Sequence, residues 1–208
     1  MIIMAIIGVK HLVYAPVTSF NTNARPTYGA GAVLAKLTKA DYSPNVVDGA
    51  FYADDIKQEE EHYVGDGTIT VGVDDLTQDT EKGIFGNKTS GSAIKELYKS
   101  SDDTAPYVGL GYIVPRKRNG VKIYEAKWFL KVMFKEPSDS AETKGESINF
   151  QGMELEGSFS PVDGFDGGRY LEKAEFSTES AAIEWLHGKA NVSGVAAASA
   201  PATQSTGK

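Results

Sequence analysis

The sequence contains no cysteine, only three histidines, and no apolar run as long as a membrane-spanning helix. The absence of cysteine excludes disulfide bonds, thiolate metal sites and a cysteine nucleophile. A transmembrane helix needs about 20 consecutive apolar residues, so we expect no membrane anchor. The short apolar run at the start has no basic residues before it and no small-residue cleavage site. It therefore favours a first strand over an export signal.

The chain has 208 residues and a formal net charge of −7. This acidic balance does not favour general attraction to nucleic acid or to anionic membranes. The length fits one large or two small domains, and a domain of this size buries roughly 70% of its unfolded surface, so it can fold without disulfides. We predict one β domain over residues 1–188. Residues 189–208 form a low-complexity tail of small and polar residues with little to bury.

Motifs for catalysis and cofactor binding are not found. The sequence has no Walker loop, no G-x-G-x-x-G after a strand and no G-x-S-x-G elbow. Ser92 and Lys95 match a Ser-x-x-Lys pair, but the Ser-Asp-Asn and Lys-Thr-Gly elements of acyl-enzymes do not follow. His11, His62 and His187 lie on unrelated elements. We therefore predict that the protein is not an enzyme and uses no cofactor or metal.

Residues 121–134, VKIYEAKWFLKVMF, show the most regular alternation in the chain. The even-numbered positions are nearly all apolar and the odd-numbered positions mix apolar with charged residues. This pattern is typical of a strand with one buried and one mixed face. Asn119-Gly120 is a strong hairpin signal and joins this strand to another at residues 107–114. In that strand Gly109 and Gly111 indicate the close approach of another element.

Further strands are predicted at residues 6–15, 33–42, 50–53, 68–73 and 148–159. In the last of these the apolar phase changes, which predicts a β-bulge near Gln151-Gly152. Residues 16–26 read as a polar loop, and residues 65–67 and 163–168 as turns. Residues 94–98 fit either a helical turn or a short strand, because periodicity does not separate the two.

Two helices are predicted. Residues 74–85 have Thr77 as a possible N-cap and Gly86 as a stop, and residues 177–187 have Ser177 as a cap and Gly188 as a stop. The predicted fold class is mainly β: a β-sandwich or barrel with one flanking α-helix and a short second helix near the C-terminus.

Acidic residues concentrate in residues 54–61, next to His62. Consecutive residues of an extended segment point in opposite directions, so a solvated acidic loop is favoured over a cation site. Loops longer than about 12–15 residues are usually functional or disordered. We therefore interpret residues 42–67 as a long loop or arm that reaches a neighbouring subunit or the next ring of subunits. The only basic cluster, at 116–118, favours a solvated hairpin tip or an ion-pair contact to a neighbour's acidic loop.

Several short motifs follow one another along the chain in an order that is typical of a known protein family. They are APYVGLGY at 105–112, NG at 119–120, WFL at 128–130, TKGESI at 143–148 and LEGSF at 155–159, preceded by GVKHL at 8–12, YADD at 52–55 and DL at 75–76. In this order the chain resembles the major tail proteins, or tail-tube proteins, of long-tailed, non-contractile bacteriophages of Gram-positive hosts. The resemblance covers roughly residues 5–160.

The resemblance implies a structural virion protein made in the host cytoplasm, with a sandwich or barrel of the tail-tube type. Such subunits form hexameric rings that stack into a tube, and DNA passes through the lumen without specific binding. Partners would be further copies and other tail proteins, such as the tape measure and tube-end proteins. The subunit or ring interface is then predicted at Tyr52, Asp54, Asp55, Glu59, Glu60, Glu61, His62, Tyr63, Arg116, Lys117 and Arg118.

Two other function classes remain open from the sequence. A capsid-decoration or cell-surface, glycan-binding β-sandwich could use Tyr107, Tyr112, Tyr124 and Trp128 as an aromatic face, although aromatics at a spacing of two are more often core. A small hydrolase would require carboxylates that face each other across a pocket.

Overall fold

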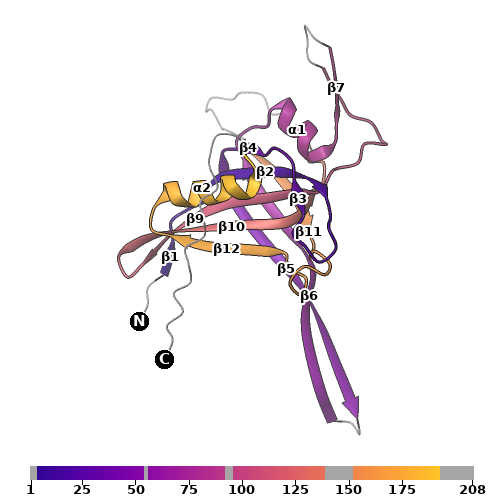
Figure 1. The fold of residues 1–208 in the computed structure, drawn as a ribbon, viewed down its shortest axis with the longest axis vertical. Helices are drawn as coiled ribbons and strands as arrows, with labels where there is room; N and C mark the ends of the chain where they lie inside the picture. The colour runs from indigo at the N-terminus through magenta and orange to yellow at the C-terminus, as the bar shows by residue number, and fades with distance from the viewer. Residues whose placement is uncertain (1–3, 54–55, 92–95, 139–151, 193–208) are drawn as a thin grey trace, which may run out of the picture.

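The computed structural model describes residues 4–53, 56–91, 96–138 and 152–192. Side chains of residues 4, 48–53 and 56–61 lie outside the description. The fold is mainly β, as predicted, with the following elements: β1 (Met4–Ile6), β2 (Lys10–Ser19), β3 (Thr27–Tyr28), β4 (Ala32–Ala35), β5 (Leu37–Ala53), β6 (Ile56–Val73), α1 (Gln78–Phe85), β7 (Lys88–Ser90), β8 (Glu96–Tyr98), β9 (Val108–Arg118), β10 (Val121–Phe134), β11 (Met153–Phe159), β12 (Leu171–Phe176) and α2 (Glu179–Ala190) (Figure 1).

The main sheet closes on itself as a barrel. Its strands pair antiparallel in the order β2-β9-β10-β11-β6-β5. β4 pairs with β2, and a single residue, Lys36, separates β4 from β5. The Lys36 N–H donates to Asp74 Oδ1 (3.0 Å) and the Asp74 N–H donates to the Lys36 carbonyl (3.1 Å). The ladder therefore returns to its first strand, which protects backbone groups that an open edge would expose.

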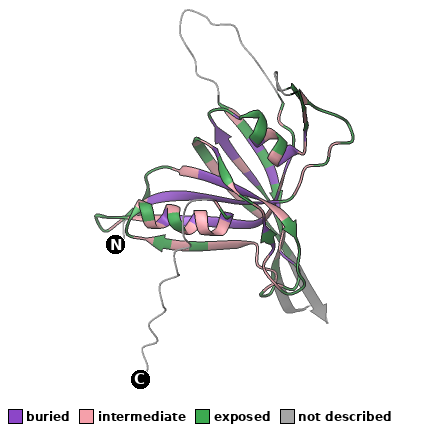
Figure 2. Cartoon of the chain, turned by 45° about the horizontal axis from the view of Figure 1, so that its top comes forward, coloured by how far each residue is buried: buried purple, intermediate pink, exposed green. Residues whose placement is uncertain are grey.

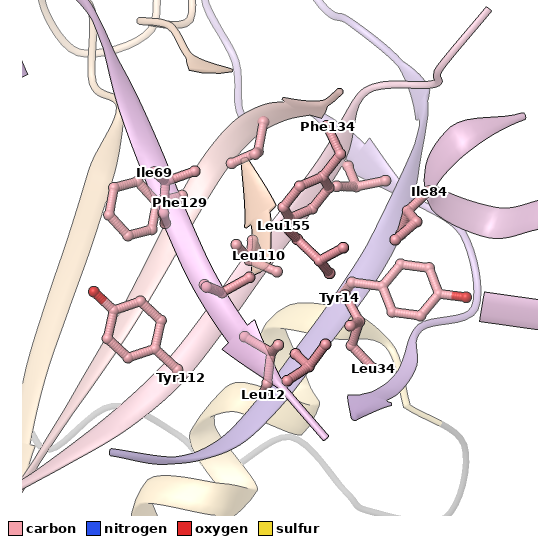
Figure 3. Packing of buried hydrophobic residues seen from close by; sticks show 14 of the residues in the cluster. Leu12, Tyr14, Leu34, Ile69, Ile84, Leu110, Tyr112, Phe129, Phe134 and Leu155 are labelled. Carbon is pink, nitrogen blue, oxygen red and sulfur yellow. The ribbon is translucent and has the colours of Figure 1, made fainter. Parts of the chain in front are cut away.

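Two hydrophobic cores lie on opposite faces of β10. Inside the barrel, Phe129 and Phe134 pack with buried residues of β2, β4, β6, β9 and β11 and with Ile84 of α1, and β5 adds the partly buried Leu37, Ala40 and Tyr42 (Figure 3). On the outer face, Ala126 and Trp128 pack beneath α2, whose other side is exposed (Figure 2). Both faces are therefore covered in the middle of β10, including the predicted mixed face, which carries Glu125 and Lys127.

The buried charges on β10 have partners within the chain. Glu125 and Lys127 are each 7% exposed. Arg116 donates to Glu125 at 3.0 Å, and the Lys127 Nζ lies 3.5 Å from Glu125 and 5.6 Å from the centre of the Tyr112 ring. Paired charges can be buried where unpaired ones cannot. The alternation in the sequence shows that this face carries charged residues, but it does not show the partners that allow these charges to be buried.

The β9–β10 hairpin is confirmed. Asn119 (φ 50°) and Gly120 (φ 86°) form its turn, as expected for a two-residue loop. Val108, Leu110, Tyr112 and Val114 face the barrel core, as predicted. The register of β10 against β9 shifts between Phe129 and Val132. This irregularity explains why Leu130 faces α2 whereas Val132, two residues later, faces the barrel interior.

Gly109 allows Trp128 to lie flat against β9. A Cβ at Gly109 would lie 2.3 Å from Trp128 Cζ2 and 2.7 Å from Tyr28 Cε1. We expect Gly109→Ala to lower the free energy of unfolding by about 1–3 kcal/mol, because the core must shift to admit the methyl group. Urea unfolding monitored by tryptophan fluorescence measures this. Gly8→Ala is the control, since no atom lies within 4 Å of its Cβ position, and unchanged stability of Gly109→Ala would contradict the packing.

Helix α1 confirms its predicted caps. The Thr77 side chain accepts from the Thr80 N–H, and Gly86 ends the helix in the left-handed conformation. For α2 the predicted caps are wrong: Thr178 is the N-cap and Asn191 (φ 50°) ends the helix. Gly188 is tolerated inside α2, because the buried Leu186 and Ala190 on either side of it pack against the barrel. α2 lies near the C-terminus as predicted, and at 12 residues it is longer than α1, which has 8.

Several strand boundaries differ from the prediction. Residues 6–15 divide into β1 and β2, and β2 runs into the predicted polar loop because the Val17 N–H donates to the Tyr107 carbonyl (2.8 Å). Residues 96–98 form a strand, β8, paired with β7. The strand β12 was not predicted, and it pairs with β10 over Tyr124 to Phe129. Ile69, Val71 and Val73 are buried as expected. The predicted bulge at Gln151 lies outside the described residues.

Residues 42–67 form a β-hairpin in place of the predicted irregular loop. β5 and β6 pair continuously from Leu37↔Val73 to Ala53↔Ile56, and β11 pairs with β6 only over Gly67 to Val73. Residues 45–66, here called the arm, therefore project from the barrel as a two-stranded ribbon (Figure 1). The predicted turn at 65–67 is wrong: these residues continue β6, with a register irregularity opposite Asn45 and Val46.

Candidate functional site

The arm carries most of the predicted interface residues. Tyr52 lies on β5 and Glu59, Glu60 and Glu61 lie on β6, close to the end of the ribbon. Asp54 and Asp55 lie outside the described residues. His62 and Tyr63 are exposed, Tyr63 at 60%.

Apolar side chains are exposed on both faces of the arm. Val46 is 50% and Val47 36% exposed, and Val47 pairs in register with Tyr63, which lies on the same face. Val46 points to the opposite face. The described side chains of the arm, at residues 45–47 and 62–66, belong to neither core.

The predicted basic cluster lies on β9 and not in a loop. Arg116 pairs with Glu125 at 3.0 Å, and Arg118 makes two hydrogen bonds to Glu175, at 2.8 and 3.1 Å. Both guanidinium groups thus have carboxylate partners in their own chain, while Lys117 is exposed. The structure does not bring the basic cluster and the acidic residues of the arm together, since the β9–β10 turn and the arm extend in different directions (Figure 1).

A groove of about 570 Å³ follows the edge of β12. Its lining includes residues from both faces of β12, such as Lys173 and Ala174, and Trp185 and Lys189 of α2 form a wall. Within the described residues, β12 pairs with β10 alone. The groove therefore presents one unpaired strand edge beside an aromatic ring. Sequence reasoning missed it because residues 171–176 alternate only weakly.

Glu172, on the floor of this groove, is surrounded by cations. Lys189 lies at 2.8 Å, Arg169 at 3.3 Å, and Arg25 also donates to it. Burial alone would raise the pKa of Glu172, but hydrogen bonds from Lys189 and Arg25 outweigh it and hold this pKa below its ordinary value. A carboxylate held in this way stays ionised and is a poor general base. It fastens β12, α2 and the loop at Arg25 to one another.

The geometry does not assemble a hydrolytic site in this groove. Glu172 faces α2, whereas Glu175 pairs with Arg118 on the other face of β12. The described residues contain no cluster of three or more metal-ligating side chains. Ser92 and Lys95 lie outside the described residues.

The four aromatic residues considered for a binding face do not share one surface. Tyr112 (1% exposed) faces the barrel interior and Trp128 (0%) lies beneath α2. Tyr124 is half-buried next to α2, and only Tyr107 reaches 37% exposure. Two of the four rings, those of Tyr112 and Trp128, are buried in different cores, so these residues do not form one aromatic binding face.

The structure brings together two histidines that sequence reasoning placed on unrelated elements. The Nε2 atoms of His11 on β2 and His187 on α2 lie 2.9 Å apart. No spacing rule could have signalled this pair, because 176 residues separate the two.

Comparison with known proteins does not supply a family. No protein-family model matches the chain, and a search of curated proteins finds no significant similarity. Over the described part of the chain, neither helix has the length and apolarity needed to cross a bilayer.

Proposed function

We propose that this protein is a self-assembling structural subunit of a phage tail tube. The observation that carries the proposal is the arm: two long paired strands that leave the barrel, and whose described side chains, at residues 45–47 and 62–66, belong to neither core. An isolated two-stranded hairpin is at best marginally stable in water. A ribbon of this kind is therefore stabilised when it packs against another molecule, and a second copy of the chain is the partner we assign to it.

The exposed groups of the arm suit such packing. Val46, Val47 and Tyr63 offer apolar surface, and three consecutive glutamates, Glu59 to Glu61, precede Tyr63 on β6. The edge of β12 offers a second place where a neighbour could add a strand. Contacts between different surfaces of successive copies generate closed rings when the rotation closes. In this proposal six copies form a ring and rings stack into a tube, within the virion.

The charge of the chain fits a conduit for DNA. Each subunit carries a net charge of −7, and duplex DNA carries a phosphate charge about every 1.7 Å of its axis. A lumen with excess negative charge would repel the duplex and allow it to pass without binding. The tube ends would contact other tail proteins, such as the tape measure. No step of this function is catalytic.

Electron microscopy of concentrated purified protein tests the proposal. We expect six-fold rings or hollow tubes, and sedimentation that depends on protein concentration. A monomer that stays monomeric at millimolar concentration would contradict the proposal and favour a binding module. Tubes whose lumen is lined by lysine and arginine would support assembly but contradict the acidic conduit.

A further inference from the structure

His11 and His187 form a direct contact between the barrel and α2. His11 has a left-handed backbone (φ 57°) within β2, where the register against β9 is irregular. His187 lies in the last turn of α2. Their Nε2 atoms are 2.9 Å apart and their ring planes are inclined by 37°. At this distance one ring donates an N–H to the other, so a single proton lies between the two Nε2 atoms.

The other nitrogen of His187 decides which protonation states the contact accepts. His187 Nδ1 is buried and has no hydrogen-bond partner among the described residues. An N–H placed there would be an unsatisfied buried donor. His187 is therefore assigned as the Nε2–H tautomer that donates, and His11 as the acceptor with its own proton on Nδ1.

One further proton disrupts this arrangement whichever ring receives it. If His187 gains the proton, its Nδ1 becomes an N–H without an acceptor. If His11 gains the proton on Nε2, two N–H groups face each other unless His187 moves its own proton to the same buried Nδ1. The neutral pair is thus the only state in which the contact is satisfied.

The charges around the pair do not offset this cost. On β2, Lys10 pairs with Glu179 of α2 at 2.8 Å, so the nearest carboxylate is already neutralised. On β12, Glu172 is held by Lys189 of α2 and by two arginines. The neighbouring strands add no further carboxylate through these residues: β10 contributes Tyr124, whose ring lies 6.0 Å from the Lys10 Nζ, and β9 contributes the apolar Ile113.

We propose that His11 and His187 form a proton-sensitive latch, which fastens α2 to the barrel while both rings are neutral and loosens it in acid. α2 covers Trp128, Ala126 and Ile113, so release of the helix would expose this outer core. The inference stands whether or not the chain assembles into tubes.

The direction of the titration agrees with this geometry. Burial lowers the pKa of both histidines, and the neighbouring His187 lowers that of His11 further, against a smaller opposing effect of Glu179. A histidine whose pKa is lowered in the folded state stabilises that state at pH values above 6.5, the ordinary pKa of the side chain. This stabilisation is lost as the pH falls below 6.5 towards the folded-state values.

A metal ion is the competing occupant of the contact. Imidazole nitrogens bind Zn²⁺ at about 2.0–2.1 Å, and a ligating histidine usually donates its other N–H to an acceptor. Metal binding through both Nε2 atoms would place an N–H on the buried Nδ1 of His187, which has no acceptor among the described residues. The geometry therefore favours the proton over the metal.

Hydrogen exchange of the whole chain at pH 7.5 and 5.0, in EDTA and corrected for intrinsic rates, tests the latch. We expect protection of α2 to fall by about tenfold at pH 5.0, while protection of β10 between residues 126 and 130 is retained. Glu172 stays ionised at both pH values because its pKa is lowered from 4.5. It therefore does not contribute to the difference.

His11→Asn removes the titrating ring and keeps a residue type that tolerates a left-handed backbone. One buried histidine, His187, still titrates in this variant, so we expect the difference in α2 protection between the two pH values to shrink. His187→Gln is a second single variant with the same expectation, and the double variant His11→Asn/His187→Gln should show the same α2 protection at both pH values. His62→Gln, which changes an exposed histidine on the arm, is the matched control and should retain the tenfold difference.

Equal protection of α2 at both pH values in the wild-type chain would overturn the proposal. So would a tenfold difference that persists in the double variant His11→Asn/His187→Gln. If Zn²⁺ added without EDTA raises α2 protection in the wild-type chain but not in His11→Asn, the contact is a metal site and the latch is overturned.

Discussion

A chain in which residues 47–63 are replaced by Asn-Gly is expected to fold normally and to form no tubes. Val46 and Val64 are register partners, so a two-residue turn can join them without changing the strands below. Both cores lie outside the removed segment, and the barrel should therefore keep its free energy of unfolding to within about 1 kcal/mol. Negative-stain microscopy and sedimentation velocity measure assembly, and thermal unfolding measures the fold.

Replacing both strands of the arm disturbs the remaining strand pairing less than removing residues 58–63 alone. Those residues all lie on β6, and their loss would leave the facing part of β5 unpaired. A matched control shortens the other projecting hairpin by replacing residues 89–97 with Asn-Gly between Lys88 and Tyr98, which are also register partners. The control should still form tubes. Tubes of normal appearance from the chain with the shortened arm would contradict the role of the arm in assembly.

Trp128→Ala and Phe129→Ala are each expected to cost about 3–5 kcal/mol in the free energy of unfolding. Both side chains are fully buried, but in different cores. Trp128→Ala removes the ring beneath α2, which meets Tyr28 edge-on at 5.3 Å between centroids. Phe129→Ala removes a ring that contacts Tyr42, Tyr112 and Phe159 inside the barrel.

The two variants should differ in which elements lose hydrogen-exchange protection. Trp128→Ala should lower hydrogen-exchange protection first in α2, whereas Phe129→Ala should lower it across β6 and β11. Urea unfolding gives the total loss of stability. Val121→Ala, at a position 66% exposed on the same strand, should change stability by less than about 0.5 kcal/mol. A loss below about 1 kcal/mol in either buried variant, or the same exchange pattern in both, would contradict the division into two cores.

The features that could be predicted from sequence depend on near neighbours in the chain. The β9–β10 hairpin follows from Asn119-Gly120, helix α1 from Thr77 and Gly86, and the buried face of residues 69–73 from simple alternation. In each case the residues that determine the conformation lie within a few positions of it. Mainly-β architecture then follows from the number of such segments.

The features that sequence reasoning missed depend on distant contacts. β12 alternates weakly and exists as a strand because β10 pairs with it. The arm resembled a loop because its acidic residues hide the alternation, although β5 satisfies the backbone of β6 throughout. α2 continues through Gly188 because its buried face meets the barrel. The contact between His11 and His187 has no local signal.

β6 belongs to both the arm and the barrel wall. It runs from Ile56 to Val73 as one strand, and its last residues, Ile69, Val71 and Val73, lie in the interior. No connecting loop separates the part that would meet a neighbour from the part that holds the core. A force on the arm therefore acts directly on the strand that carries these core residues, and in the proposed assembly the docking of one copy would load the core of the next.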